Sequence, residues 1–147
     1  MSNQKSLKFF LVDDDVFCLN LYQQFLEKLG YSEIECFNRC KDCIDNLQNR
    51  PDIIFLDYSM DEMNGIEVLQ AIKLFDESIT VIFISGQENV EVAVAALKYG
   101  AYDYIVKSKI TPSLLQSIID RLVSDKEVVT KPIKKSLFGK VGAALGI

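Results

Sequence analysis

Residues 52–57 read DIIFLD, a short apolar run with an aspartate at each end. Comparable runs occur at 7–12 (LKFFLV) and 80–84 (TVIFI), and continuous apolar stretches of this length are typical of strands buried on both faces. Two further stretches, 34–37 and 102–106 (YDYIV), have strand-like composition. The sequence therefore predicts five strands.

Segments with helical spacing of apolar residues follow the predicted strands. They are 16–29, 39–49 with Asn38 as N-cap, 66–75, 89–99, and a last helix that begins at Thr111-Pro112 and runs through Leu122. The order is (βα)5. Right-handed crossovers with short connections turn five such units into an α/β fold, a doubly wound parallel sheet with helices on both faces, whereas a closed barrel needs eight units.

The composition narrows the classes of protein that fit. The chain has 147 residues, of which 49% are apolar and only 3 are proline, so it has enough apolar material for one compact domain. It contains no histidine, which excludes histidine bases, nucleophiles and metal ligands. Any chemistry must use carboxylates, hydroxyls, amines or thiols.

The formal charge of −5 is unevenly distributed: 11 basic and 19 acidic residues occur up to Ser124, and 5 basic and 2 acidic residues follow it. An acidic globule is a poor nucleic-acid binder, because that binding depends on Lys and Arg displacing counterions. No apolar run reaches the roughly 18 to 20 residues of a membrane span, and no secretory leader follows Met1. We therefore expect a cytoplasmic protein with no direct nucleic-acid contact.

The four cysteines, Cys18, Cys36, Cys40 and Cys43, are partly clustered. Their spacing matches no strong zinc pattern, and no histidine can complete one. We predict that they pack in the core rather than hold a metal or form disulfides.

Polar residues follow four of the predicted strands. They are Asp13-Asp14-Asp15, Asp57, Ser85 and Lys107. Doubly wound sheets bind ligands at the carboxyl ends of their strands, so these side chains are expected to converge. Each alone is equally consistent with a helix cap or a solvated strand end, but crowded carboxylates need neutralisation. A hard divalent cation such as Mg²⁺ supplies it.

This set resembles half of a phosphoryl-transfer site. No GxxxxGK[ST] loop is present to bind a nucleotide, which argues against ATP as the direct donor. A carboxylate can itself be the nucleophile, and Asp57 is the best candidate. Asp13, Asp14 and Asp57 would then hold the metal, while Lys107 pairs with the phosphoryl group and Ser85 hydrogen-bonds to it.

Several separated motifs occur in one order along the chain. They are Asp13-Asp14, residues 57–65 (DYSMDEMNG), Ser85-Gly86 and residues 97–107 (LKYGAYDYIVK). In this combination the chain, from about residue 7 to 123, resembles a response regulator receiver domain of two-component signalling.

The resemblance implies a flavodoxin-like strand order 2-1-3-4-5 and phosphotransfer to Asp57 from the phosphohistidine of a sensor histidine kinase or a phosphotransfer protein, with Mg²⁺. It also implies metal binding by Asp14, Asp57 and the backbone carbonyl of Ser59, with Asp13 acting mostly through water. Phosphoryl lifetime in the family depends partly on the positions of Ser59 and Gln87. Such a domain is a phosphoacceptor rather than an enzyme in the ordinary sense.

Ser85 and Tyr104 match the family's coupled switch pair. By resemblance the hydroxyl of Ser85 moves toward the phosphoryl group and the ring of Tyr104 turns inward. The face built from the helix at 89–99, the strand at 102–106 and the last helix then changes its preference for a downstream protein partner. The resemblance also allows a homodimer through this face.

Two positions depart from the family pattern. The family commonly has proline where this chain has Asp61 and Ser108, the second after a cis peptide. A cis Lys107–Ser108 bond would cost about 3 to 4 kcal/mol relative to trans. Either the surrounding structure holds that strain, or the loop differs from the family pattern. The second case would affect how far the ammonium of Lys107 reaches toward Asp57. We expect metal-dependent phosphorylation to survive both changes.

We divide the chain into a receiver domain at 1–124 and a basic, partly apolar tail at 125–147. Residues 125–135 are a predicted polar linker, and residues 136–147 (SLFGKVGAALGI) are either a frayed end or a peptide that docks a partner or a membrane surface. About two dozen residues are too few for an effector domain, so a stand-alone receiver is expected.

Two alternatives remain open at this stage. A Mg²⁺ phosphohydrolase of haloacid-dehalogenase type would use Asp13 with Asp15, but Phe17 is atypical there, no cap insertion is present and Asp57 is left without a role. A receiver-fold scaffold would signal by binding alone. Flavin binding is disfavoured, because three aspartates have the wrong charge for a phosphate loop.

Overall fold

The computed structural model describes residues 6–60 and 62–130, the last four of these by their backbone alone. It contains one five-stranded parallel sheet in the order β2-β1-β3-β4-β5. The strands are β1 (Lys8–Val12), β2 (Glu33–Phe37), β3 (Ile53–Asp57), β4 (Thr80–Ser85) and β5 (Asp103–Val106). The predicted fold class and strand order are therefore confirmed.

Helices occupy the connections, as the spacing of apolar residues predicts. The α-helices are α1 (Val16–Lys28), α2 (Cys40–Asp45), α3 (Gly65–Phe75), α4 (Val90–Lys98) and α5 (Pro112–Thr130), and the short 3₁₀ turns are η1 (Leu47–Asn49) and η2 (Lys107–Lys109). The chain divides into two compact units between Pro112 and Ser113, and nearly all of α5 belongs to the second.

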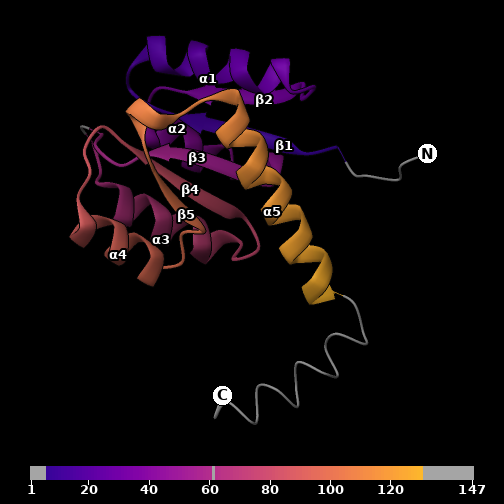
Figure 1. Ribbon diagram of the computed structural model, residues 1–147. Coiled ribbons are helices and arrows are strands. Elements are labelled where there is room, and N and C mark those ends of the chain that lie inside the picture. The colour runs from indigo at the N-terminus through magenta and orange to yellow at the C-terminus, as the bar shows by residue number, and fades with distance from the viewer. Residues whose placement is uncertain (1–5, 61, 131–147) are drawn as a thin grey trace. The chain divides into compact units, whose positions relative to one another are not determined.

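Alternating residues of the central strands build two apolar layers, one on each face of the sheet. Figure 1 shows α1 beside one face, and α3 and α4 beside the other. On the second face, strand residues such as Phe10, Leu56 and Phe83 share one buried cluster with residues of α2, α3 and α4. Burial of both faces explains the continuous apolar runs of β1, β3 and β4.

Strand register brings the carboxyl ends of β1 and β3 together. Val12 pairs with Leu56 on β3 and with Phe37 on β2, and the N–H of Asp13 extends the latter ladder by donating to the carbonyl of Phe37 at 3.1 Å. Asp57 pairs with Ile84 of β4. Asp13 and Asp57 thus leave neighbouring strands at the same edge of the sheet.

The second predicted helix differs from the structure in two ways. It is shorter, since α2 ends at Asp45 and the 3₁₀ turn η1 follows. The predicted cap is also wrong: Arg39, not Asn38, is the N-cap residue, and its side chain makes no cap hydrogen bond. The N–H of Cys40 donates instead to the carboxylate of Glu62, in the β3–α3 loop.

The last helix is longer than predicted. It starts at Pro112, as expected, but continues to Thr130, so that residues 125–130, predicted as linker, are helical. The predicted domain boundary at residue 124 falls inside α5. Asp61 and the tail segment 136–147 lie outside the described residues. Where the structure describes the chain, no helix combines the length and apolarity that crossing a bilayer requires.

The cysteines divide into two environments. Cys40 and Cys43 lie on the buried side of α2 and are fully buried, as predicted. Cys36 is exposed and Cys18 is half-buried, so core packing is the wrong prediction for Cys36. The reason is its place on β2, an edge strand with a single neighbour.

Candidate acidic phosphoryl-acceptor site

The last residue of β3, Asp57, occupies the centre of the carboxyl edge of the sheet. It is 3% exposed, because β1 and β4 flank its strand. The N–H of Ser59 lies 3.4 Å from Asp57 Oδ1, and the N–H of Tyr58 donates to the carbonyl of Ile84 at 2.9 Å. The position of this carboxylate is thus set by the strand and by the first residues of the following loop.

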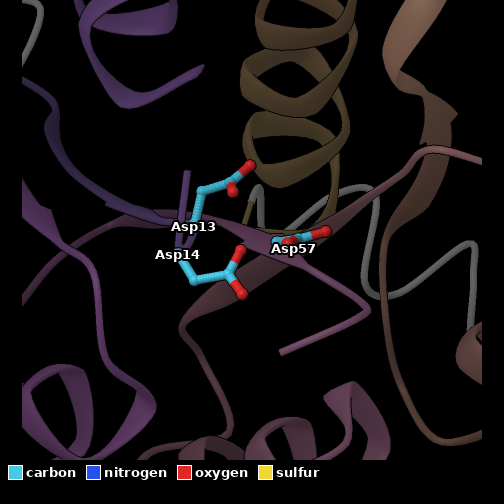
Figure 2. Close-up of side chains that lie close together, drawn as sticks. All are labelled: Asp13, Asp14 and Asp57. Carbon is cyan, nitrogen blue, oxygen red and sulfur yellow. The ribbon is translucent and has the colours of Figure 1, made fainter. Parts of the chain in front are cut away.

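Two more carboxylates come from the loop after β1. Asp13 is buried and Asp14 is exposed. One carboxylate oxygen from each of Asp13, Asp14 and Asp57 lies within 4.8 Å of the other two. Figure 2 shows the three side chains close together, from the ends of two strands. Of the side chains expected to converge, Asp13, Asp14 and Asp57 lie together.

The donor set fits a hard divalent cation. Three carboxylates in this space repel one another unless positive charge balances them, and Mg²⁺ takes oxygen ligands, usually one or two carboxylates with water and phosphate oxygens. Because Asp14 is exposed, one side of the cluster is open to solvent. Such an opening leaves room for water and for a phosphoryl oxygen.

Lys107 supplies an ammonium group to the same cluster. Its Nζ lies 3.0 Å from Asp13 Oδ2 and 3.7 Å from Asp57 Oδ1. Burial lowers the pKa of Lys107, but the pairing with Asp13 and the charge of Asp57 outweigh burial, and the net pKa is raised. Lys107 is therefore a fixed positive charge between two buried carboxylates.

The replacement of the family proline by Ser108 does not change this reach. Among the described residues every peptide bond is trans, including Lys107–Ser108. The chain turns through η2 directly after β5, and Lys107 still contacts both aspartates. The trans geometry differs from the cis peptide common in the family, and the ammonium reaches the cluster without it.

The protonation of Asp57 is strongly perturbed. Burial, and next the nearby charge of Asp13, raise the pKa of Asp57 to about 7, against the lowering effects of Lys107 and of the Ser59 N–H. The ionised form of Asp57 is thus poorly stabilised in the metal-free protein. A cation bound at the cluster would favour its ionised form.

Ser85 and Tyr104 are joined through the backbone of one residue, Gln87. Ser85 is buried at the end of β4, and its Oγ accepts from the N–H of Gln87 at 3.2 Å. The hydroxyl of the half-buried Tyr104 donates to the carbonyl of the same Gln87 at 3.0 Å. Two residues that the sequence analysis pairs are thus linked through the loop after β4.

The β3–α3 loop is closed at its base. The N–H of Gly65 donates to the carbonyl of Tyr58 at 3.1 Å, and Ser59 forms an antiparallel bridge with Asn64. Asn64 and Glu67 form a reciprocal capping box at the start of α3. A side chain at Gly65 would collide with the ring of Phe83, so only glycine fits.

Asp15 does not join the carboxylate cluster. Its Oδ1 caps α1 by accepting from the N–H of Phe17 at 2.9 Å, and its Oδ2 lies 3.6 Å from the thiol of Cys18. The phosphohydrolase alternative requires Asp13 and Asp15 as a catalytic pair. With Asp15 engaged as a helix cap, that arrangement is not supported.

Sequence comparison identifies the family. A family model, "Response regulator receiver domain", matches residues 9–120. The chain belongs to this family and is a receiver domain of two-component signalling. The transcriptional regulatory protein ZraR of Klebsiella oxytoca is 32% identical over 137 residues, which are 90% of this chain and 30% of that protein. Response regulator protein TodT of Pseudomonas putida is 32% identical over 119 residues, 80% of this chain and 52% of TodT.

The chain thus spans about 30% of ZraR and about half of TodT. Among solved structures, a CheY-like receiver domain from Methanospirillum hungatei is similar with a TM-score of 0.76 and 26% identity, over 84% of this chain and 98% of that one. A chain in the CheX–CheY–BeF3–Mg²⁺ complex from Borrelia burgdorferi is similar with a TM-score of 0.74 and 26% identity, over 80% of this chain and 89% of that one.

Proposed function

We propose that this receiver domain is a phosphorylation-dependent switch in which Asp57 accepts a phosphoryl group from the phosphohistidine of a sensor kinase or a phosphotransfer protein. The observation that carries the proposal is the cluster of Asp13, Asp14, Asp57 and Lys107 at one edge of the sheet. Asp13, Asp14, Asp57 and the backbone carbonyl of Ser59 would hold Mg²⁺.

The proposed chemistry is a substitution at phosphorus. An Asp57 oxygen forms a bond to phosphorus as the P–N bond of phosphohistidine breaks, and the released imidazole nitrogen keeps the electron pair and takes up a proton. Bound Mg²⁺ supplies positive charge to the phosphoryl oxygens. Lys107, within 3.7 Å of Asp57, is placed to pair with a phosphoryl oxygen on that carboxylate. Ser85 is the proposed hydroxyl partner of the same group.

The proposed response passes through Ser85, Gln87 and Tyr104. A shift of the Ser85 hydroxyl toward a phosphoryl group breaks its bond with the Gln87 N–H, and the Gln87 carbonyl holds Tyr104. Tyr104 lies on β5, which packs beside α4. Because α4 exposes Val90, Val94 and Leu97 at helical spacing, a downstream protein is proposed to bind a face that includes α4 and β5.

The same proposal includes a cytoplasmic location, regulation of a protein rather than of nucleic acid, and a docking role for the basic segment 125–147. The CheX–CheY complex, described with BeF3 and Mg²⁺, offers a similar chain with the metal and a protein partner together.

Intact-mass measurement after incubation with a small phosphodonor, with and without Mg²⁺, tests the proposal. The wild-type protein is expected to gain one phosphoryl group only with Mg²⁺, and Asp57→Asn is expected to gain none. An unmodified wild-type protein under every condition would refute the phosphorylation switch and leave a binding module.

A further inference from the structure

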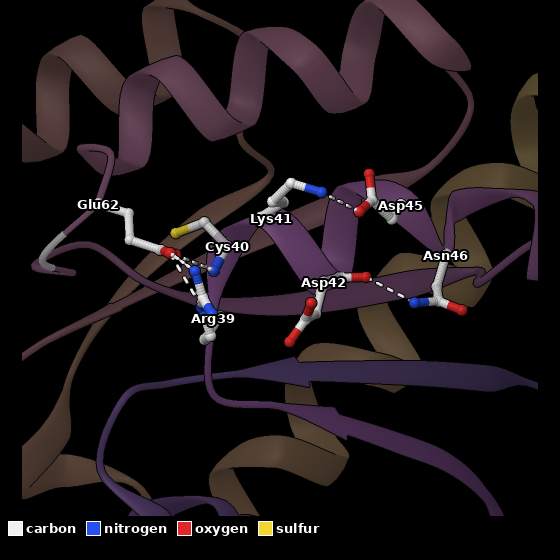
Figure 3. Close-up of polar contacts among 7 residues, drawn as sticks. All are labelled: Arg39, Cys40, Lys41, Asp42, Asp45, Asn46 and Glu62. Carbon is white, nitrogen blue, oxygen red and sulfur yellow. Dashed lines mark hydrogen bonds and ion pairs between the residues drawn. The ribbon is translucent and has the colours of Figure 1, made fainter.

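Glu62 ties the β3–α3 loop to the start of α2. Its Oε2 accepts from Arg39 Nε at 2.9 Å and from the guanidinium Nη2 at 2.5 Å, while its Oε1 accepts from the N–H of Cys40 at 3.1 Å. Figure 3 shows both Arg39 and the Cys40 backbone directed at the same carboxylate. We call this set of contacts among Arg39, Cys40 and Glu62 the loop anchor.

The loop anchor replaces a local helix cap. The N-cap residue Arg39 makes no side-chain cap bond of its own, and the first N–H groups of a helix favour a negatively charged acceptor. Glu62 supplies that acceptor from a segment 22 residues further along the chain. The hydrogen bond to Arg39, and with it the charge of Arg39 and the N–H groups of Cys40 and Lys41, lowers the pKa of Glu62. The carboxylate is therefore ionised at neutral pH.

The anchored loop begins at the proposed phosphoacceptor. Ser59 lies between Asp57, whose Oδ1 is 3.4 Å from the Ser59 N–H, and Asn64, with which Ser59 forms a bridge. Met60 and Met63 of the same loop are partly buried and pack against the apolar cluster that includes residues of α2 and α3. The loop is thus fixed at its base by the backbone and near its tip by Glu62.

We infer that Glu62 is a positioning residue: through the loop anchor it holds the backbone of Ser59 beside Asp57 and thereby sets the affinity of the carboxylate cluster for Mg²⁺. The inference rests on the proposed function, in which the Ser59 carbonyl is a metal ligand. Groups that orient a ligand of a metal typically change metal affinity by about tenfold or more when they are removed.

Substitution of each side-chain partner of the loop anchor, Glu62 and Arg39, separates a positioning effect on Mg²⁺ affinity from a purely electrostatic one. Removing Glu62 takes away a negative charge and would weaken Mg²⁺ binding by charge alone. Removing Arg39 takes away a positive charge and would strengthen binding by charge alone. Loss of positioning weakens binding in both variants, so the sign of the Arg39 effect decides between the explanations.

The experiment measures Mg²⁺ affinity by calorimetry for the wild-type protein, Glu62→Ala and Arg39→Ala. Lys41→Ala is the matched control, because Lys41 forms an exposed ion pair with Asp45 on the same helix, 2.7 Å apart, and does not contact the loop through its side chain. We expect about tenfold weaker binding for Glu62→Ala, weaker binding by at least threefold for Arg39→Ala, and less than a twofold change for Lys41→Ala.

Glu62→Gln provides a milder variant that keeps an acceptor for the Cys40 N–H. It is expected to retain an affinity between those of the wild type and Glu62→Ala. Hydrogen exchange at the Ser59 amide, measured without Mg²⁺, is expected to be faster in Glu62→Ala and unchanged in the Lys41→Ala control.

Three results would overturn the inference. They are an unchanged Mg²⁺ affinity in folded Glu62→Ala, tighter binding in Arg39→Ala, and equal losses in Glu62→Ala and the Lys41→Ala control. A wild-type protein that binds no Mg²⁺ would instead refute the proposed function on which the inference rests, a result visible before any variant is compared.

Discussion

Replacing Asp57 with asparagine is expected to stabilise the metal-free protein at pH 8. The substitution keeps the size of the side chain but removes one of the two buried negative charges that Lys107 contacts, in a cluster that also contains Asp14. Asp57 is 3% exposed, so water does little to screen this repulsion. The loss of its 3.7 Å contact with Lys107 is the smaller effect, since Lys107 stays paired with Asp13 at 3.0 Å.

The pKa of Asp57 gives the magnitude. The folded-state pKa of about 7 exceeds the ordinary value of 3.8, so the folded protein holds a proton that the unfolded chain has released. The contribution of Asp57 to the free energy of unfolding is therefore greatest below about pH 4, and it is lost as the pH rises through 7. At 1.36 kcal/mol per pKa unit, the full loss is at most about 4 kcal/mol. Asparagine, which is always neutral, avoids this loss.

The assay is urea unfolding of both proteins at pH 8 and pH 5, without divalent cations. Asp57→Asn is expected to be more stable by about 1 to 4 kcal/mol at pH 8, with the difference falling to less than half of that at pH 5. Saturating Mg²⁺ is expected to stabilise only the wild-type protein to a substantial degree, by about 1.4 kcal/mol at ten times its Kd. Equal stabilities at pH 8, or a gap that widens toward pH 5, would refute the electrostatic reasoning.

Three further predictions concern single residues. Lys107→Ala is expected to bind Mg²⁺ more tightly, because a positive charge next to Asp13 and Asp57 is lost. The variant is expected to accept phosphoryl groups at least about tenfold more slowly, because the same charge no longer pairs with the phosphoryl group. Unchanged rates of phosphorylation, followed by intact mass, would contradict this. The free energy of unfolding of Gly65→Ala in urea is expected to fall by roughly 1 to 3 kcal/mol. The added methyl group would collide with the ring of Phe83 and lie 3.0 Å from the ring of Tyr58. A variant as stable as the wild type would argue against such tight packing. Cys40 and Cys43 are expected to resist thiol reagents in the folded protein, since burial, the largest effect, raises their pKa values to about 11 and about 12, while the exposed Cys36 reacts first; peptide mapping of alkylated protein checks the order.

The sheet and the cluster of carboxylates could be predicted because their determinants are local and repeated. Each central strand is an unbroken apolar run, and parallel strands bring their carboxyl ends to one edge. An aspartate directly after such a run must lie at that edge. The cluster of Asp13, Asp14 and Asp57 follows from those two facts together.

The loop anchor could not be predicted, because it depends on contacts between segments far apart in sequence. Asn38 is a good cap residue by type, but Glu62 reaches the first N–H groups of α2 instead. The exposure of Cys36 follows from the edge position of β2, which apolar composition does not reveal. The continuation of α5 through Thr130 was also missed, because residues 125–130 carry only two apolar residues with which to extend the pattern. The absence of Gly and Pro from this stretch is consistent with the continued helix.

The position of the phosphoryl group is the most direct test of the central claim. Borohydride reduces an aspartyl phosphate to homoserine, so peptide mass spectrometry after phosphorylation with Mg²⁺ and reduction reports the modified residue. Phosphotransfer to Asp57 is expected to give homoserine at position 57 and unchanged aspartates at positions 13 and 14. Homoserine at either of those positions, or a borohydride-resistant phosphate on Ser85, would contradict it.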